Sequence, residues 1–341
     1  MTTSVIDSPK AVELAKNLVD QISKAVADGD DAASAREVLS DLLRAQGGVT
    51  PPSNPHAAKK VEEKPAVDGL SLGEKKLARP NGEFYWTRKL GIHDDIAALR
   101  KAREEGINIL CYGPPGTGKT ALIEAAYADA ESGARVYTVQ GSGDTETADF
   151  IGGYVQLPDG MFQWVDGPLL RAMEEGAVCY IDEVALIDPK VLAVIYGVMD
   201  GRGEILVTAN PERGVVTAKE GFYIVAACNP NAPGARMSEA LTSRFTLQVL
   251  VTTDYKLVRQ LGVPTKFVTA AQNLERKREK GEVGWSPQMR ECLAFKKMAA
   301  VFGEDVALRN VISTAPEIDR PTVMDVLSRS FAKPLNELDL A

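Results

Sequence analysis

The sequence is poor in the residues that build disulfide frameworks and zinc modules. Only 4 of its 341 residues are cysteine and 2 are histidine, and the cysteines are widely spaced. Structural zinc sites need such ligands in closely spaced pairs, so this spacing excludes a zinc module and favours free thiols. Cys111, Cys179 and Cys228 each lie in a short apolar run. We expect them to pack as small hydrophobic side chains in buried strands.

Long apolar runs and an excess of positive charge are also missing. No run approaches the roughly 18 residues needed to cross a bilayer, and the opening MTTSVIDSPK lacks the basic-then-apolar order of a signal peptide. These features predict a cytoplasmic protein without a membrane span. The formal net charge of −8 disfavours a protein whose main role is to coat nucleic acid.

What is present is the composition of a folded protein, with 45% hydrophobic and 25% charged residues in a chain long enough for two or three domains. Helical spacing predicts a helical segment over 1–46, and the Pro-, Lys- and Glu-rich stretch 47–80 predicts a flexible linker. Apolar runs alternate with helical patterns over 81–253, which predicts an α/β domain with a parallel sheet. Residues 254–341 predict a small all-helical domain. The expected strands are Ile107–Tyr112, Arg135–Gln140, Ala177–Ile181, Tyr223–Ala227 and Thr246–Val251.

The stretch GPPGTGKT, residues 113–120, follows an expected strand and precedes a strong helix-forming segment. This is the context of a P-loop, in which glycines let backbone amides face a phosphate at the start of a helix. Lys119 is placed to reach the β- and γ-phosphates, and the hydroxyl of Thr120 is placed to bind Mg²⁺. The expected nucleotide-binding residues are Gly113, Pro114, Pro115, Gly116, Thr117, Gly118, Lys119, Thr120 and Ala121.

Three further stretches carry the residues that hydrolysis requires. AVCYIDE, 177–183, is an apolar strand ending in two acids, which places Asp182 beside the metal and leaves Glu183 to deprotonate a water. Asn229 follows the next apolar strand and can hold the same water, or it can form an Asx-turn. Arg244, in LTSRF, can reach a γ-phosphate as an arginine finger, or it can form a surface ion pair.

In this order the elements resemble the AAA+ ATPases, and the text between them resembles the MoxR-like branch that includes CbbQ, NirQ and GvpN proteins. The resemblance covers roughly Phe84–Pro334. It implies that GPPGTGKT is Walker A, CYIDE is Walker B, Asn229 is sensor 1 and Arg244 is the arginine finger. It also implies ATP and Mg²⁺ as ligands, and a P-loop NTPase sheet followed by a helical lid.

Two stretches resemble the inserts of that branch. Residues 150–173 resemble the helix-2 insert, and residues 204–227 resemble the hairpin before sensor 1. Met161, Phe162 and Trp164 are then candidate pore contacts, with a packed aromatic cluster in a hairpin as the alternative.

The lid departs from the family pattern. GWSPQMREC has Gln288 where MoxR proteins commonly carry an arginine, so Arg290 is our candidate for sensor 2. The alternative is an ion pair of Arg290 on a helix surface. Arg236 is a second candidate, ranked below Arg244, for acting on a neighbouring subunit.

The resemblance implies a homo-oligomeric, hexameric ring that hydrolyses ATP at subunit interfaces and remodels a protein client, often with a separate von Willebrand factor A domain partner. One alternative is a nucleic-acid-translocating motor that uses Arg213 and Lys219. Another is an ATP-gated assembly scaffold, which would leave Glu183 and its neighbours without a purpose. No Asn-Lys-x-Asp motif reads guanine, and FYWTRKLGIHDD, residues 84–95, is expected to pack on the base.

Overall fold

The computed structural model describes residues 76–128 and 135–339. The predicted helical segment 1–46 and the predicted linker up to residue 75 lie outside these residues. The end of the predicted linker is a strand, because β1 (Lys76–Ala78) pairs antiparallel with β2 (Phe84–Trp86). Leu77 lies opposite the buried Tyr85 and packs on the same hydrophobic cluster, so the domain begins before Asn81.

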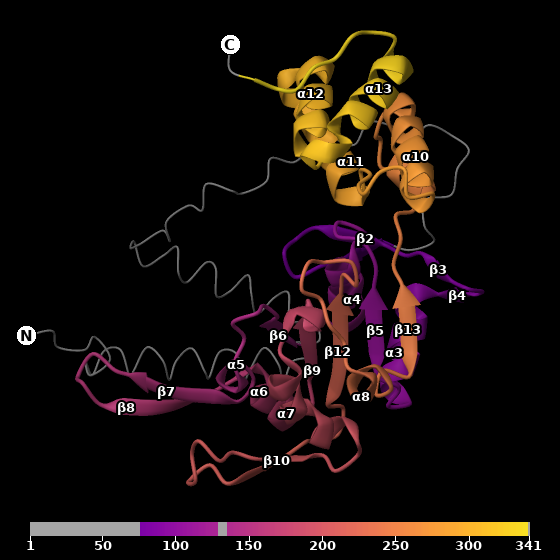
Figure 1. Cartoon of the computed structure of the whole chain (residues 1–341). Helices are drawn as coiled ribbons and strands as arrows, with labels where there is room; N and C mark the ends of the chain where they lie inside the picture. The colour runs from indigo at the N-terminus through magenta and orange to yellow at the C-terminus, as the bar shows by residue number, and fades with distance from the viewer. Residues whose placement is uncertain (1–75, 129–134, 340–341) are drawn as a thin grey trace, which may run out of the picture. The chain divides into compact units, whose positions relative to one another are not determined.

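Five parallel strands form the central sheet of the described residues, in the spatial order β13-β5-β12-β9-β6 (Figure 1). They are β5 (Ile109–Tyr112), β6 (Val136–Gln140), β9 (Val178–Asp182), β12 (Tyr223–Cys228) and β13 (Leu247–Leu250). All five strands predicted from the sequence are confirmed. The middle strand, β12, has all six residues buried, as expected of a parallel strand covered on both faces. Because the strands are parallel, their carboxyl ends share one edge of the sheet.

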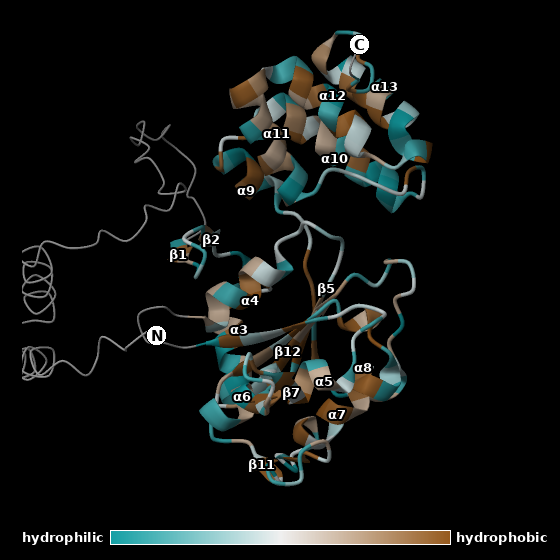
Figure 2. Ribbon diagram, turned by 90° about the vertical axis from the view of Figure 1, so that its left-hand side faces the viewer, coloured by the Kyte–Doolittle hydropathy of each residue, from teal (hydrophilic) through white to brown (hydrophobic). Residues whose placement is uncertain are grey.

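Alternate residues of these strands supply two hydrophobic clusters on opposite faces of the sheet. In β9, Cys179 and Ile181 belong to one cluster, and Val178 and Tyr180 belong to the other. Figure 2 shows the labelled strands β5 and β12 in the brown of hydrophobic residues. The covering helices are α3 (Asp95–Glu104), α4 (Lys119–Tyr127), α5 (Thr147–Ile151), α6 (Pro168–Glu175), α7 (Pro189–Met199) and α8 (Glu239–Thr242). The predicted α/β core is therefore confirmed, with Cys111, Cys179 and Cys228 buried in its strands as free thiols.

Besides the β1–β2 hairpin, three antiparallel hairpins decorate the core within the described residues. They are β3 (Lys89–Leu90) with β4 (His93–Asp94), β7 (Gly152–Gln156) with β8 (Phe162–Asp166), and β10 (Glu204–Leu206) with β11 (Val215–Thr217). The second and third lie in the two stretches that resemble family inserts. The β7–β8 hairpin projects from the sheet and its helices (Figure 1).

After β13 the described residues are helical, as predicted. The helices are α9 (Tyr255–Gln260), α10 (Thr265–Glu279), α11 (Met289–Phe302), α12 (Glu304–Thr314) and α13 (Arg320–Phe331). They share a hydrophobic cluster of their own, in which the rings of Phe267 and Phe295 stack with centroids 3.8 Å apart.

Candidate functional site

The loop between β5 and α4 requires glycine where the sequence has it. A Cβ at Gly113 would meet the carbonyl oxygen of Val251 at 2.5 Å. Gly116 has a φ of +77°, and a Cβ there would meet the Cβ of Arg290 at 3.0 Å. The glycines of the P-loop motif therefore let the loop turn tightly against the end of β13 and the start of α11.

Lys119, the first residue of α4, lies inside this loop. Its Nζ donates hydrogen bonds of 2.9 Å to the carbonyl oxygens of Gly113 and Pro114, and the residue is 7% exposed. Burial lowers the pKa of the Lys119 ammonium, against the opposing effect of the Glu183 and Asp182 carboxylates. The ammonium is thus held at the positive end of a helix, a position that favours a phosphate.

The hydroxyl of Thr120 lies at the end of β9. Its Oγ1 is 3.4 Å from Oδ2 of Asp182 and 3.2 Å from the hydroxyl of Tyr180. Hydroxyl and carboxylate oxygens are ligands that suit Mg²⁺. Within the described part of the chain, no group of three or more His, Cys, Asp or Glu side chains could hold a metal ion. The donor set fits a Mg²⁺ ion that takes its remaining ligands from phosphate and water.

Glu183 follows β9 with a left-handed backbone. Its φ of 47° is unusual for a residue other than glycine. Its carboxylate accepts a hydrogen bond of 3.2 Å from the backbone N–H of Asn229, the first residue after β12. The ends of β9 and β12 therefore bring the predicted base and the predicted sensor into contact.

The side chain of Asn229 does not make that contact. Its Oδ1 accepts a hydrogen bond of 3.1 Å from the backbone N–H of Asn231, which is the Asx-turn considered as an alternative. The structure thus brings Asn229 to Glu183 through its backbone amide.

A cavity of about 790 Å³ is bordered by the phosphate-binding loop and by the two acids at the end of β9. Its lining includes Pro115, Gly116, Thr117, Gly118, Lys119, Thr120, Ala121, Asp182 and Glu183. Gly113 and Pro114 are not in the lining and instead accept the hydrogen bonds of Lys119.

The β1–β2 hairpin supplies another part of the lining. Phe84, Tyr85 and Trp86 all line the cavity, and Nζ of Lys76 lies 3.7 Å from the ring centroid of Phe84 and 5.4 Å from that of Trp86. The stretch expected to pack on a nucleotide base thus presents three aromatic side chains to the cavity, and the Lys76 ammonium from β1 lies beside two of them.

Arg290 comes from α11 and lines the same cavity. Its backbone N–H donates a 3.0 Å hydrogen bond to the carbonyl oxygen of Gly116. Among the described residues it forms no ion pair, so the alternative of a helix-surface pair is not found. Gln288 is buried, closes a capping box with Glu291 and accepts a 2.7 Å hydrogen bond from the hydroxyl of Thr253. Gln288 therefore holds the start of the helix, whereas Arg290 lines the cavity.

Arg244 does not line the cavity of its own chain. Its Nε and Nη2 each donate a 2.7 Å hydrogen bond to the carboxylate of Asp200, and its guanidinium lies 4.2 Å from the ring centroid of Tyr196. This bonding holds the pKa of Asp200 below its usual value. The surface ion pair considered as the alternative is therefore present. The backbone N–H of Arg236 donates a 2.6 Å hydrogen bond to the carbonyl oxygen of Ala185.

The three candidate pore contacts differ in exposure. Met161 and Phe162, at the tip of the β7–β8 hairpin, are each 65% exposed. Trp164 is half-buried, with its ring edge against Tyr154 at a centroid distance of 5.3 Å and its N–H donating to Asp166 at 2.6 Å. Trp164 therefore packs within the hairpin, as the alternative interpretation predicted.

The two basic residues of the β10–β11 region, Arg213 and Lys219, differ in their surroundings. The guanidinium of Arg213 pairs with Asp166 at 3.0 Å and with Glu174, which ties the β10–β11 hairpin to β8 and α6. Lys219 is exposed. Arg213 is thus paired with two carboxylates of its own chain, which gives no support to its use by a nucleic-acid motor.

Sequence reasoning did not select Arg88, which contacts the backbone of the phosphate-binding loop at Thr117. No motif marks this residue, and the contact joins positions 29 residues apart. Within residues 76–128 and 135–339, no helix has the length and apolar character needed to cross a membrane.

Comparison with known proteins places the site in a family. Residues 108–245 match the family described as the AAA domain (dynein-related subfamily). Protein NorQ of Paracoccus denitrificans is 37% identical over 137 residues, which are 40% of this chain and 49% of that protein. An uncharacterized protein of Staphylococcus aureus is 37% identical over 154 residues, which are 43% of this chain and 56% of that protein. The matches thus span about half the length of these curated relatives.

A crystal structure of a candidate ATPase from Cytophaga hutchinsonii is 16% identical, covers 67% of this chain and 78% of that chain, and has a TM-score of 0.39. This score is too low to bear on the fold. The family match covers the phosphate-binding loop, both acids, Asn229 and Arg244. The recognition of an AAA+ ATPase from the sequence is therefore confirmed over residues 108–245, which form an AAA domain.

Proposed function

We propose that the chain hydrolyses ATP to ADP and phosphate and uses the reaction to remodel or activate a protein client. The observation that carries this proposal is a single cavity lined by Lys119, Thr120, Asp182, Glu183 and Arg290. A cavity that only bound nucleotide would need the phosphate-binding loop and Lys119, but it would not need Glu183. The acid after Asp182 serves hydrolysis more than binding, which disfavours an assembly scaffold that does not turn ATP over.

Each side chain has a defined task in this proposal. The backbone amides at the start of α4 and the ammonium of Lys119 bind the phosphates. Thr120 and Asp182 hold Mg²⁺, which supplies charge neutralisation at the phosphate oxygens when it is bound. The carboxylate of Glu183 accepts the proton of the attacking water, and the backbone N–H of Asn229 fixes the orientation of that carboxylate. Arg290 adds positive charge from the helical lid, which we place from residue 254 onward.

Arg244 enters the proposal through a second subunit. In its own chain it is paired with Asp200 and lies outside the cavity lining. We propose that it acts on the nucleotide of a neighbouring subunit, which makes a closed, hexameric ring the working form. The exposed side chains of Met161 and Phe162 then contact the client, and a separate von Willebrand factor A domain protein is the partner we expect.

The reaction is tested by measuring ATP turnover and ADP affinity in the wild type and in two variants. Glu183→Gln should bind ADP like the wild type and lose turnover by roughly 10²–10⁴-fold, because only the proton acceptor is removed. Lys119→Met should lose ADP binding. Wild-type turnover in Glu183→Gln would contradict the assignment of the base.

A further inference from the structure

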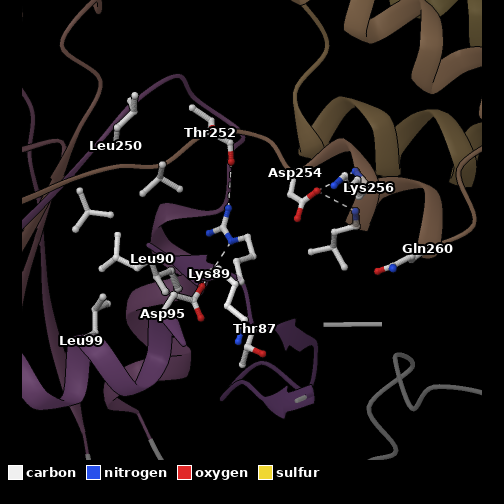
Figure 3. Close-up of a pocket in the computed structure, with 15 residues that line it drawn as sticks. Thr87, Lys89, Leu90, Asp95, Leu99, Leu250, Thr252, Asp254, Lys256 and Gln260 are labelled. Atoms are coloured by element: carbon white, nitrogen blue, oxygen red, sulfur yellow. Dashed lines mark hydrogen bonds and ion pairs between the residues drawn. The ribbon is translucent and has the colours of Figure 1, made fainter. Parts of the chain in front are cut away.

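One arginine joins the phosphate-binding loop to the end of the sheet. Arg88 lies between β2 and β3. Its Nη1 donates to the carbonyl oxygens of Thr117 at 3.3 Å and Thr252 at 3.1 Å, and its Nε donates to the hydroxyl of Tyr85 at 3.0 Å. Arg88 lines both the nucleotide cavity and a second cavity of about 540 Å³. Figure 3 shows the second cavity, with the bond to Thr252 as a dashed line.

The guanidinium is held in place by a buried acid. Asp95, at the start of α3, is 5% exposed, and its carboxylate lies 3.7 Å from Nε of Arg88. The hydroxyl of Tyr85 donates to the same carboxylate, and Tyr85 itself lines the nucleotide cavity. The arginine side chain is only 13% exposed, so its position is set by packing and by charge.

The contact with Thr117 determines how one amide of the loop is oriented. A trans peptide is planar, and its C=O and N–H point in opposite directions. A carbonyl of Thr117 held toward Arg88 therefore directs the N–H of Gly118 away from Arg88. Gly118 is the N-cap of α4 and has a φ of 90° with no side chain to restrain it. The Thr117–Gly118 peptide is held through the carbonyl oxygen of Thr117, and amides at this end of a helix are the groups that bind phosphate.

We propose that Arg88 is a positioning residue for nucleotide binding, which fixes the Thr117–Gly118 peptide with its N–H toward the phosphates and ties it to Thr252. The inference rests on the proposed function, since it concerns the same site. Arg88 itself contacts no reacting atom. Its removal leaves every group that takes part in hydrolysis in the chain, so it should weaken binding far more than it slows turnover at saturation.

The test measures the dissociation constant of Mg-ADP, and the KM and kcat for ATP, in full-length Arg88→Lys and Arg88→Gln proteins. Lysine keeps the charge beside Asp95 but lacks the fork that reaches two carbonyls. We expect Arg88→Gln to weaken ADP binding about tenfold and Arg88→Lys to fall between it and the wild type. The kcat at saturating ATP should change by no more than about twofold, because the base and the metal ligands remain.

Arg103 provides the matched control. Its guanidinium also bridges two carbonyls, donating to Gly221 at 2.7 Å and to Gly176 at 3.0 Å, but these residues precede β12 and β9 at the opposite edge of the sheet. Arg103→Gln should lower thermal stability like Arg88→Gln and leave ADP affinity unchanged. Arg88→Lys answers the same question if Arg88→Gln does not fold.

Two results would overturn the inference. The first is that the Arg88→Gln and Arg88→Lys proteins both fold and bind ADP as tightly as the wild type. The other is an Arg103→Gln protein that loses as much ADP affinity as Arg88→Gln, which would reduce the effect to general destabilisation. A wild-type chain that bound no ADP would instead overturn the proposed function, so the two failures are distinct.

Discussion

Arg244 is fixed by Asp200 of its own chain through two hydrogen bonds of 2.7 Å, in the described region between α7 and β13. Two parallel bonds between a guanidinium and a carboxylate restrain the direction of the arginine as well as its position. The pair therefore presents a pre-oriented cation on the surface of the core, away from the lining of the cavity in the same chain.

The pair of Arg244 and Asp200 predicts that loss of the arginine lowers ATP turnover far more than loss of the carboxylate does. Arg244→Ala should lower the ATPase rate by roughly 10³–10⁵-fold, as removal of an arginine finger does. Asp200→Asn keeps the cation and loses only its restraint, so its rate should fall about fivefold at most. The control is Arg329→Ala, which removes an exposed pair with Asp325 on α13 and should leave the rate unchanged. Equal losses in Asp200→Asn and Arg244→Ala would contradict a restraining role for Asp200.

The left-handed backbone of Glu183 predicts a difference in stability between two inactive variants. Side chains with a Cβ are disfavoured at positive φ, so Glu183→Gly should have a free energy of unfolding about 1 kcal/mol above that of Glu183→Ala. Denaturant unfolding measures the difference. The same pair of changes at Glu174, inside α6, should give the opposite order, because glycine disfavours a helix. Equal stabilities at position 183 would argue against the left-handed conformation.

Gly141 controls the position of both acids. Its N–H donates a 2.8 Å hydrogen bond to the carbonyl oxygen of Asp182, and a Cβ there would meet the carbonyl oxygens of Asp182 and Glu183 at 2.6 Å. Gly141→Ala must therefore displace the end of β9. We expect a loss of about 1–3 kcal/mol in stability and a fall in kcat of up to roughly 10²-fold.

The control for this change lies two residues along the chain. A Cβ at Gly143 would meet no heavy atom within 4 Å. Gly143→Ala should therefore keep both stability and kcat. A Gly141→Ala protein with wild-type kcat would show that the site does not depend on this close approach.

The lowered pKa of Lys119 predicts how ADP affinity depends on pH. The ammonium form pairs with phosphate, and burial makes this form scarcer at high pH than for an exposed lysine. Affinity should therefore fall as pH rises through the lowered pKa of Lys119, below the usual lysine pKa of about 10.4. Because the folded pKa lies below the unfolded one, folding releases a proton, and this group makes the free energy of unfolding rise with pH in the same window.

Calorimetry of Mg-ADP binding across that range measures the effect. Burial raises the pKa of the nearby Cys228 thiol to about 11, so this cysteine stays protonated over most of the window. Lys296→Met removes another lysine of the cavity lining, whose Nζ is bonded to the carbonyl of Leu261, and should keep the pH dependence. A constant affinity up to about pH 10 would contradict a buried, titrating Lys119.

Local patterns were enough to predict the parts of the site that follow directly from strands. The five strands, the loop of Gly113–Thr120 and the acids Asp182 and Glu183 could be predicted because apolar runs and glycine positions are constrained by neighbours in the sequence. The buried thiols followed from the same runs.

Contacts between distant segments could not be predicted in this way. Arg88 reaches Thr252, 164 residues away, and nothing in either local sequence marks the pair. Arg213 could be predicted as a cation but not as the partner of Asp166, 47 residues earlier. The strand β1 falls inside the predicted linker because three residues with one half-buried side chain carry too weak a pattern.

An ATP site that is completed by a neighbouring subunit can be tested by mixing Glu183→Gln and Arg244→Ala proteins. Each variant alone should hydrolyse little ATP. In an equal mixture, some interfaces pair an intact cavity with an intact Arg244, so turnover should recover and should rise with protein concentration. A mixture no more active than its components, beside a wild type whose specific rate is independent of concentration, would contradict a shared site.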